Sequence, residues 1–234
     1  MKEIIINNLN IEVEKKSIKN MYIKVLPPDG KVVITVPKTV NDDIIRMFVI
    51  SKINWIKNQK EKFENQSRQT KRQYITGESY YLWGRRYRLD VQYVKSRNNI
   101  ILVGEKIILE IKKESTIEQR AKVLNEWYRQ QLKEKIPIVL KKCENIVGIK
   151  ASDCRIKNMK TKWGTCNIEK GRIWINLQLV KKIPRCLEYV IIHELVHLLE
   201  RHHNERFYRF MDLYYPDWRV TKDILNQQML DYFQ

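Results

Sequence analysis

The sequence has 234 residues, of which 43% are hydrophobic and 31% are charged, a balance that suits a globular chain with its own apolar core. No stretch approaches the roughly 20 apolar residues of a membrane-spanning helix. Acidic residues follow the first short apolar run, so no signal peptide is expected. The four cysteines contain no CxxC pair and predict free thiols in a reducing cytoplasm, not a disulfide scaffold.

The formal net charge is +18, and the excess of basic residues is spread over both halves of the chain. The stretch from Lys150 to Arg172 is locally richer in basic residues than its surroundings. Such a balance predicts an anionic partner, for example a nucleic acid or an acidic polypeptide. A solvated basic surface without a specific partner explains the same charge equally well.

Residues 1–115 predict a β-rich region that contains one long helix. A helix capped by Asn41 or Asp42 is expected to run to about Glu64, because apolar residues recur at near-helical spacing. A Pro-Pro-Asp-Gly turn over residues 27–30 separates two of the expected strands. The strands are expected at Ile4–Ile6, Ile11–Val13, Met21–Leu26, Val32–Val36, Tyr80–Trp83, Tyr87–Val91, Ile100–Val103 and Ile107–Ile111.

Residues 116–234 predict a mainly helical half with a small sheet. A helix begins at Thr116 and is expected to kink or restart at Pro137, because proline lacks the amide hydrogen that the helix needs. A strand over 151–159, a loop over 160–171 and a strand over 172–179 follow. Pro184 opens the next helix, and two more helices are expected on either side of Pro216. The predicted fold class is therefore α+β.

The chemistry is concentrated in the HExxH sequence from His193 to His197. Two residues four apart on a helix differ by only about 40° in direction, so both imidazoles can bind one metal ion. Glu194 lies between them and can accept a proton from a water that the metal activates. All four histidines of the chain fall within eleven residues, which favours a zinc site over a chance match.

His203 is the preferred third ligand, ten residues after His193. A continuous helix would carry residue 203 about 240° away from His197, so the helix must end near Leu199 to Arg201. Metzincins place a glycine at this turn, where the present chain has Glu200. His202 is the second choice of ligand, and Asp212 or Asp217 would supply a carboxylate instead.

These residues lie in a chain that resembles the YgjP-like metallopeptidase family of the zincin group, whose site is related to that of SprT-like and WLM peptidases. The resemblance spans nearly the whole chain and rests on several segments besides HExxH. They are Tyr81–Leu89, Lys160–Cys166, Ile173–Leu179, the sequence after His197 through Phe207, and Tyr214–Arg219. It implies one zinc ion held by His193, His197 and His203, with Glu194 as general base. The family also lacks a glycine at the turn, so Glu200 is compatible with it.

The segment Trp163-Gly164-Thr165-Cys166 is expected to form a tight turn before a strand, with Gly164 allowing unusual backbone dihedrals. Trp163 suits packing in the core as well as the wall of a cleft. Thr165 stands where the family more often has serine, which keeps a hydroxyl. Trp163, Gly164, Thr165 and Asn176 are the expected substrate-binding residues. The strand over 172–179 is a candidate edge for an extended peptide.

The predicted function is zinc-dependent hydrolysis of peptide bonds, with a polypeptide as substrate and no membrane partner. A second interpretation is a basic, nucleic-acid-associated zinc protein, which either acts on proteins bound to DNA or holds its zinc for structure only. Salt-dependent DNA binding without proteolysis would favour it. A third is a zinc hydrolase of amides other than peptides. The predicted domains are a β-rich region over 1–115 and a zincin-like catalytic domain over 116–234.

Overall fold

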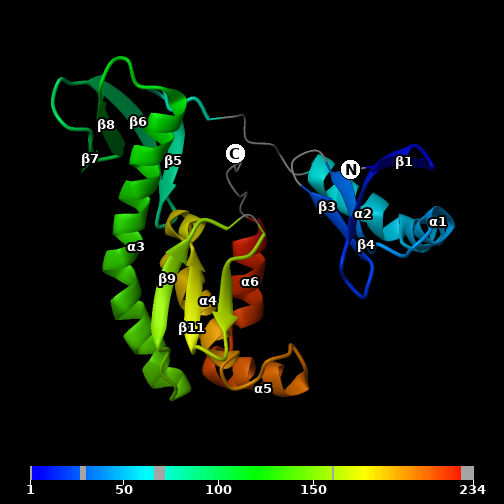
Figure 1. Cartoon of the computed structure of the whole chain (residues 1–234). Coiled ribbons are helices and arrows are strands. Elements are labelled where there is room, and N and C mark those ends of the chain that lie inside the picture. The colour runs from blue at the N-terminus through cyan, green and yellow to red at the C-terminus, as the bar shows by residue number, and fades with distance from the viewer. Residues whose placement is uncertain (1, 27–29, 66–71, 160, 228–234) are drawn as a thin grey trace. The chain divides into compact units, whose positions relative to one another are not determined.

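The structure is a computed structural model that describes residues 2–26, 30–65, 72–159 and 161–227. Most of the Pro-Pro-Asp-Gly turn expected at 27–30, and Lys160 of the family motif, lie outside these residues. The chain divides into two compact units, Met1–Thr70 and Lys71–Gln234. Helices and strands alternate in blocks, which confirms the α+β class (Figure 1). None of the helices in the described ranges has the length and apolar composition needed to cross a bilayer.

The first unit contains a four-stranded sheet and two helices, and its strands agree with the predicted ones. The elements are β1 (Lys2–Ile6), β2 (Leu9–Lys16), β3 (Tyr22–Leu26), β4 (Lys31–Pro37), α1 (Asp42–Ser51) and α2 (Ile53–Asn65). The strand order is β1-β2-β4-β3, in which only β2 and β4 run parallel. Alternate residues of β2 are buried, as expected for a sheet with one covered face.

The single helix predicted between residue 41 and Glu64 is wrong, because the chain forms two helices there. Asn41 caps α1 by accepting a hydrogen bond from the amide of Ile44 at 3.0 Å. The amide of Lys52 turns back to the carbonyl of Val49 at 3.0 Å and ends the helix. Both helices bury apolar residues in the same cluster. The spacing of apolar residues therefore stays near-helical across the break at Lys52.

The second unit begins with a sheet of the same strand order and pairing directions as the first. Its elements are β5 (Ser79–Leu82), β6 (Arg85–Tyr93), β7 (Asn99–Val103) and β8 (Lys106–Ile111), in the order β5-β6-β8-β7. In both sheets the first hairpin turns through two residues with positive φ. These are Asn7 (48°) and Asn8 (61°) in one, and Trp83 (49°) and Gly84 (81°) in the other.

One long helix, α3 (Ile117–Val147), lies beside both sheets of the second unit (Figure 1). Thr116 and Gln119 form a reciprocal capping box at its start. The expected restart at Pro137 is wrong, since the helix continues through this residue. Pro137 is solvent-exposed, so water can satisfy the carbonyl that loses its amide partner in the preceding turn.

The remaining elements of the second unit hold the residues of the candidate site. They are β9 (Asp153–Lys157), β10 (Gly164–Asn167), β11 (Arg172–Asn176), the 3₁₀ segment Leu177–Lys181, α4 (Pro184–Val196), α5 (Glu205–Tyr214) and α6 (Trp218–Gln227). The helices agree with prediction, whereas the loop expected over 160–171 contains β10. The short β10 escaped prediction because its four residues, Gly164 to Asn167, carry too few apolar side chains to show an alternating pattern.

The three-stranded sheet has the order β10-β11-β9, antiparallel and then parallel. The segment 172–179 was expected to offer a free edge to a peptide, and this is wrong for β11, which pairs on both sides. Among the described strands, the edge next to α4 is β10. The 3₁₀ segment follows β11 directly, where a continuous strand to Leu179 had been expected.

The core of the second unit is one continuous cluster that joins its sheets to its helices. Tyr80 of β5, Leu89 of β6 and Leu109 of β8 belong to this cluster. So do Tyr128 of α3 and Leu195 of α4. The sheet over residues 79–111 therefore packs with the helical half, and the contacts divide the chain after residue 70. The predicted division after residue 115 differs because a strand-to-helix change in sequence pattern does not show which elements share a core.

Candidate metal centre and active site

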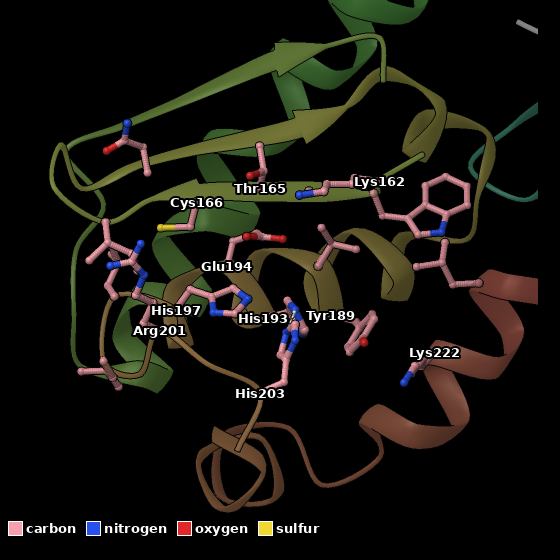
Figure 2. Close-up of a pocket in the computed structure, with 18 of the residues that line it drawn as sticks. Lys162, Thr165, Cys166, Tyr189, His193, Glu194, His197, Arg201, His203 and Lys222 are labelled. Carbon is pink, nitrogen blue, oxygen red and sulfur yellow. Dashed lines mark hydrogen bonds between the residues drawn. The ribbon is translucent and has the colours of Figure 1, made fainter. Parts of the chain in front are cut away.

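Helix α4 carries the HExxH sequence in its last turn. Pro184 occupies its first turn, where a missing amide hydrogen costs nothing, and His197 is its C-cap. Leu187, Ile191 and Leu195 are fully buried and fix one face of the helix in the core. The opposite positions at spacing four, including His193 and His197, face a cavity (Figure 2).

The chain turns sharply after α4 and returns with His203. The amide of Glu200 donates to the carbonyl of Val196 at 2.8 Å, which closes the last helical turn. Asn204 then caps α5 by accepting from the amide of Phe207 at 3.0 Å. The helix thus ends before His203, as its position required, and no glycine is needed for the turn.

Three imidazoles meet in the cavity. The ligand-capable atoms of His193, His197 and His203 all lie within 4.8 Å of one another. The Nε2 atoms of His193 and His203 are only 3.1 Å apart. Phe207 packs against the group, with its ring centroid 4.6 to 5.0 Å from those of the three imidazoles. Two nitrogens that converge so closely fit a shared cation.

The environment favours neutral imidazoles, the form that binds a metal. Burial lowers the pKa of His193 to about 3, and it also lowers the pKa values of His197 and His203. Nδ1 of His197 lies 3.2 Å from the carbonyl oxygen of Glu200. A proton on this Nδ1 leaves the lone pair of Nε2 directed at the cluster, which is the usual arrangement of a metal-binding histidine. The donor set therefore fits a metal ion.

The other proposed ligands do not join this cluster. His202 is exposed and does not belong to the group of converging donors among the described residues. Asp212 accepts hydrogen bonds from Trp218 and Arg219, at 2.7 and 2.5 Å. Asp217 pairs with Arg185 at 2.8 Å. Of the candidate third ligands, the structure brings only His203 to His193 and His197.

Glu194 lies beside the imidazoles, under β10 (Figure 2). It is 5% exposed, and within the described part of the chain its Oε2 has no hydrogen-bond partner. Burial raises the pKa of this carboxyl group to about 8, against a smaller lowering by the charge of Lys162. A carboxylate with a raised pKa and a free oxygen can accept a proton near neutral pH.

A cavity of about 900 Å³ surrounds these groups. Trp163, Gly164 and Thr165 line it, and their binding of substrate stays a prediction. Asn176 does not line it. Its side chain is 2% exposed and binds the carbonyl oxygens of Met159 and Lys162 at 2.9 and 2.6 Å. Asn176 thus holds the segment that leads into β10.

Gly164 serves a different purpose from the one expected. Its φ is not positive, so the backbone there needs no glycine for its dihedrals. A Cβ atom at this position would lie 2.6 Å from Oε1 of Glu194 and 2.8 Å from Cγ1 of Val190. The missing side chain is what allows β10 to cover the carboxyl group of Glu194.

Several cavity residues were not expected from the sequence. Tyr189 lines the wall one helical turn before His193, and its spacing of four from that residue was a usable indication. Lys222 reaches the cavity from α6, and Arg201 from the turn after α4. No sequence pattern marks these two, because only the packing of α6 and the turn against α4 brings them to the site.

The three imidazoles could hold a metal ion, and the buried carboxyl group of Glu194 lies beside them. The chain belongs to the YgjP-like metallopeptidase domain family, whose model matches residues 19–228. Membership makes the protein a peptidase that depends on a metal ion and acts on polypeptides. The resemblance noted in the sequence is thereby confirmed.

Two solved structures are similar to parts of the chain. The metallopeptidase zymogen abylysin of Pyrococcus abyssi is 23% identical, with 39% of this chain and 90% of that chain covered at a TM-score of 0.36. The zymogen jannalysin of Methanocaldococcus jannaschii is 21% identical, with 41% and 97% covered at a TM-score of 0.36. These scores do not establish a shared fold. No curated protein matches the chain.

Proposed function

We propose that the chain is a zinc peptidase in which His193, His197 and His203 hold one zinc ion and Glu194 is the general base. The observation that carries the proposal is the convergence of the three donors within 4.8 Å beside a buried carboxyl group. Three protein ligands with an open fourth position are typical of catalytic zinc, whereas structural zinc is usually closed by four.

Zinc, when bound, polarises a carbonyl group and makes a water molecule acidic enough to lose a proton near neutral pH. Glu194 accepts that proton, and its pKa of about 8 then suits it to pass the proton on to the leaving amine. β10 passes close over Glu194 at Gly164, and the side chain of Glu194 is buried. This burial is the cause of the raised pKa of Glu194.

The open edge of β10 is the proposed binding place for the peptide. The carbonyl of Trp163 accepts from the amide of Asn176 at 2.9 Å, so positions 163 and 165 bond to β11. In an antiparallel ladder the backbone groups of Gly164 and Cys166 then point to the other edge, beside the cavity. An extended peptide could pair with them, which would place one of its carbonyl groups near the imidazoles.

The proposed location is the cytoplasm, and the proposed substrate is a polypeptide. All four cysteines are free thiols, which fits the cytoplasm. A nucleic acid partner rests on the charge of +18 and on the basic stretch from Lys150 to Arg172, and it gains no support from the family. The family name favours peptides over other amides as substrate.

The proposal is tested with a Glu194→Gln protein loaded with zinc and offered casein as an unfolded substrate. We expect zinc to stay bound while cleavage falls by at least about 100-fold, the usual share of general-base catalysis. Glu188→Gln is the matched control, because Glu188 lies on the same helix but pairs with Lys142 outside the cavity. Undiminished cleavage by zinc-loaded Glu194→Gln would overturn the role of Glu194.

A further inference from the structure

Two lysines approach the cavity from different walls. Lys162 stands just before β10 on the sheet side, and Lys222 stands on α6. Figure 2 shows Lys162 above Glu194 and Lys222 on the opposite side of His193 and Tyr189. Both side chains are exposed, so both ammonium groups remain open to a ligand that enters the cavity.

The charges of the two lysines act on different members of the site. Besides burial, the charge of Lys222 contributes to the lowered pKa values of His193 and His203. The charge of Lys162 acts on Glu194, where it opposes the raised pKa, and adds to the lowering of the His197 pKa. Both lysines line the same cavity as the imidazoles, Lys162 from the side of β10 and Lys222 from α6 (Figure 2).

The cavity offers these cations few acidic partners of its own. Its lining includes the cations Lys162, Arg201 and Lys222, and the acids Glu169 and Glu194. Within the described residues neither lysine forms an ion pair, and Lys222 only approaches the ring of Trp218, at 5.6 Å. The site thus presents positive charge to whatever binds beside the imidazoles.

We propose that the preferred substrate is an acidic peptide that carries a carboxylate side chain on each side of the scissile bond, one for Lys162 and one for Lys222. The inference rests on the proposed peptidase function and adds the class of its substrate. The net charge of +18 acts in the same direction, since it attracts acidic chains from a distance.

The size of the preference follows from the exposure of the lysines. An ion pair in contact with water contributes little, and each lysine is expected to strengthen binding by about threefold to fivefold. The two together give about tenfold, and the preference weakens as salt is added because screening acts on exposed charges.

The test measures binding and not turnover. Zinc-loaded Glu194→Gln protein is titrated with a short alanine–serine peptide that has glutamate on both sides of its central bond. A twin peptide has glutamine in both places, and both carry an uncharged fluorophore for anisotropy. We expect the glutamate peptide to bind about tenfold more tightly than the glutamine peptide. The difference should fall to about threefold when either Lys162 or Lys222 is replaced by glutamine, and it should disappear when both are replaced.

The matched control replaces Lys133 and Lys141 by glutamine, which removes the same charge from exposed positions of α3 outside the cavity. This control should keep the preference. The inference is wrong if the two peptides bind equally well to the protein with both lysines. It is also wrong if the preference for the glutamate peptide survives replacement of both Lys162 and Lys222, or if the control loses the preference to the same extent. Zinc content and the thermal midpoint of each variant establish that the site and fold are intact.

The two proposals fail in different ways. If wild-type protein cleaves both peptides and the inactive variant binds them equally, the peptidase function stands and the acidic preference is wrong. If the glutamate peptide binds selectively but zinc-loaded wild-type protein cleaves neither the peptides nor casein, the acidic preference stands and the peptidase function is wrong.

Discussion

The carboxyl group of Glu194 is covered by a strand that can come close only because residue 164 has no side chain. A Cβ atom there has no room, since Oε1 of Glu194 would be 2.6 Å away. The strand excludes water from the carboxyl group, and this exclusion raises its pKa to about 8. One glycine therefore controls both the geometry and the basicity of the proposed catalytic group.

This environment predicts a pH-dependent stability of the metal-free protein. Glu194 binds its proton more tightly in the folded chain, with a pKa of about 8, than in the unfolded chain, with a pKa of 4.5. The folded state is therefore favoured fully below about pH 4.5, and this contribution is lost as pH rises toward 8. Replacing Glu194 by glutamine removes the loss.

We expect metal-free Glu194→Gln to exceed metal-free wild type in free energy of unfolding by roughly 4 kcal/mol at about pH 8, and by less than about 1 kcal/mol at about pH 5. Urea denaturation followed by circular dichroism at both pH values measures the difference. A difference independent of pH would show that Glu194 does not titrate in this range.

The residues of the site differ in how far apart they lie along the chain. The spacing of His193, Glu194, His197 and His203 is local, so a helix and one turn suffice to predict that they meet. Lys222 and the role of Gly164 depend on the packing of elements far apart in sequence. Asn176 was predicted to bind substrate, yet its short side chain is buried and supports the backbone.

The hairpin turn between β5 and β6 is hydrogen-bonded to the 3₁₀ segment that precedes α4. The amide of Trp83 donates to the carbonyl of Val180 at 2.8 Å, and that of Gly84 to the carbonyl of Lys181 at 3.3 Å. Gly84 also packs against Ile183, the residue that precedes Pro184. The first sheet of the second unit therefore helps to place the helix that carries the site.

Gly84→Ala should be strongly destabilising for two reasons. Its φ is +81°, and a Cβ atom would collide with Cγ2 of Ile183. We expect a loss of about 3 kcal/mol, from backbone strain plus overpacking. Gly104→Ala is the matched control, because its φ is +55° but no atom lies within 4 Å, and it should lose about 1 kcal/mol. Thermal unfolding of both variants compares them, and equal losses would contradict a tight contact at Ile183.

The elements that sequence periodicity predicted are those with long apolar patterns, such as α3 and the strands of the two four-stranded sheets. β10 has four residues and one edge partner, so its strand geometry comes from pairing with β11 and not from its own composition. The break at Lys52 and the continuous helix through Pro137 are likewise tertiary outcomes. Both outcomes depend on which residues are buried in the apolar core and which remain exposed to water.

At the scale of the whole molecule, the two four-stranded sheets share one strand order and the same kind of first hairpin. They belong to separate apolar clusters, one in each unit. The site, with all three imidazoles and Glu194, lies within the second unit. This unit therefore contains the described elements that carry the three imidazoles and Glu194.

A chain of residues 71–234 should fold and bind metal without the first unit. A chain of residues 116–234 should not, because it lacks the core residues of β5–β8, among them Tyr80, Leu89 and Ile107. Circular dichroism, cooperative thermal unfolding and metal content compare the two fragments. Cooperative folding of the shorter fragment would restore the domain boundary at residue 115.

If three histidines hold one metal ion, the purified protein contains one ion per chain, and its metal content measures this. Elemental analysis of wild type, His203→Ala and His202→Ala, each purified after growth with zinc, compares neighbouring histidines of which only His203 joins the cluster. We predict one zinc per chain in wild type and His202→Ala, and little or none in His203→Ala. Full zinc in His203→Ala, or none in wild type, would contradict the account.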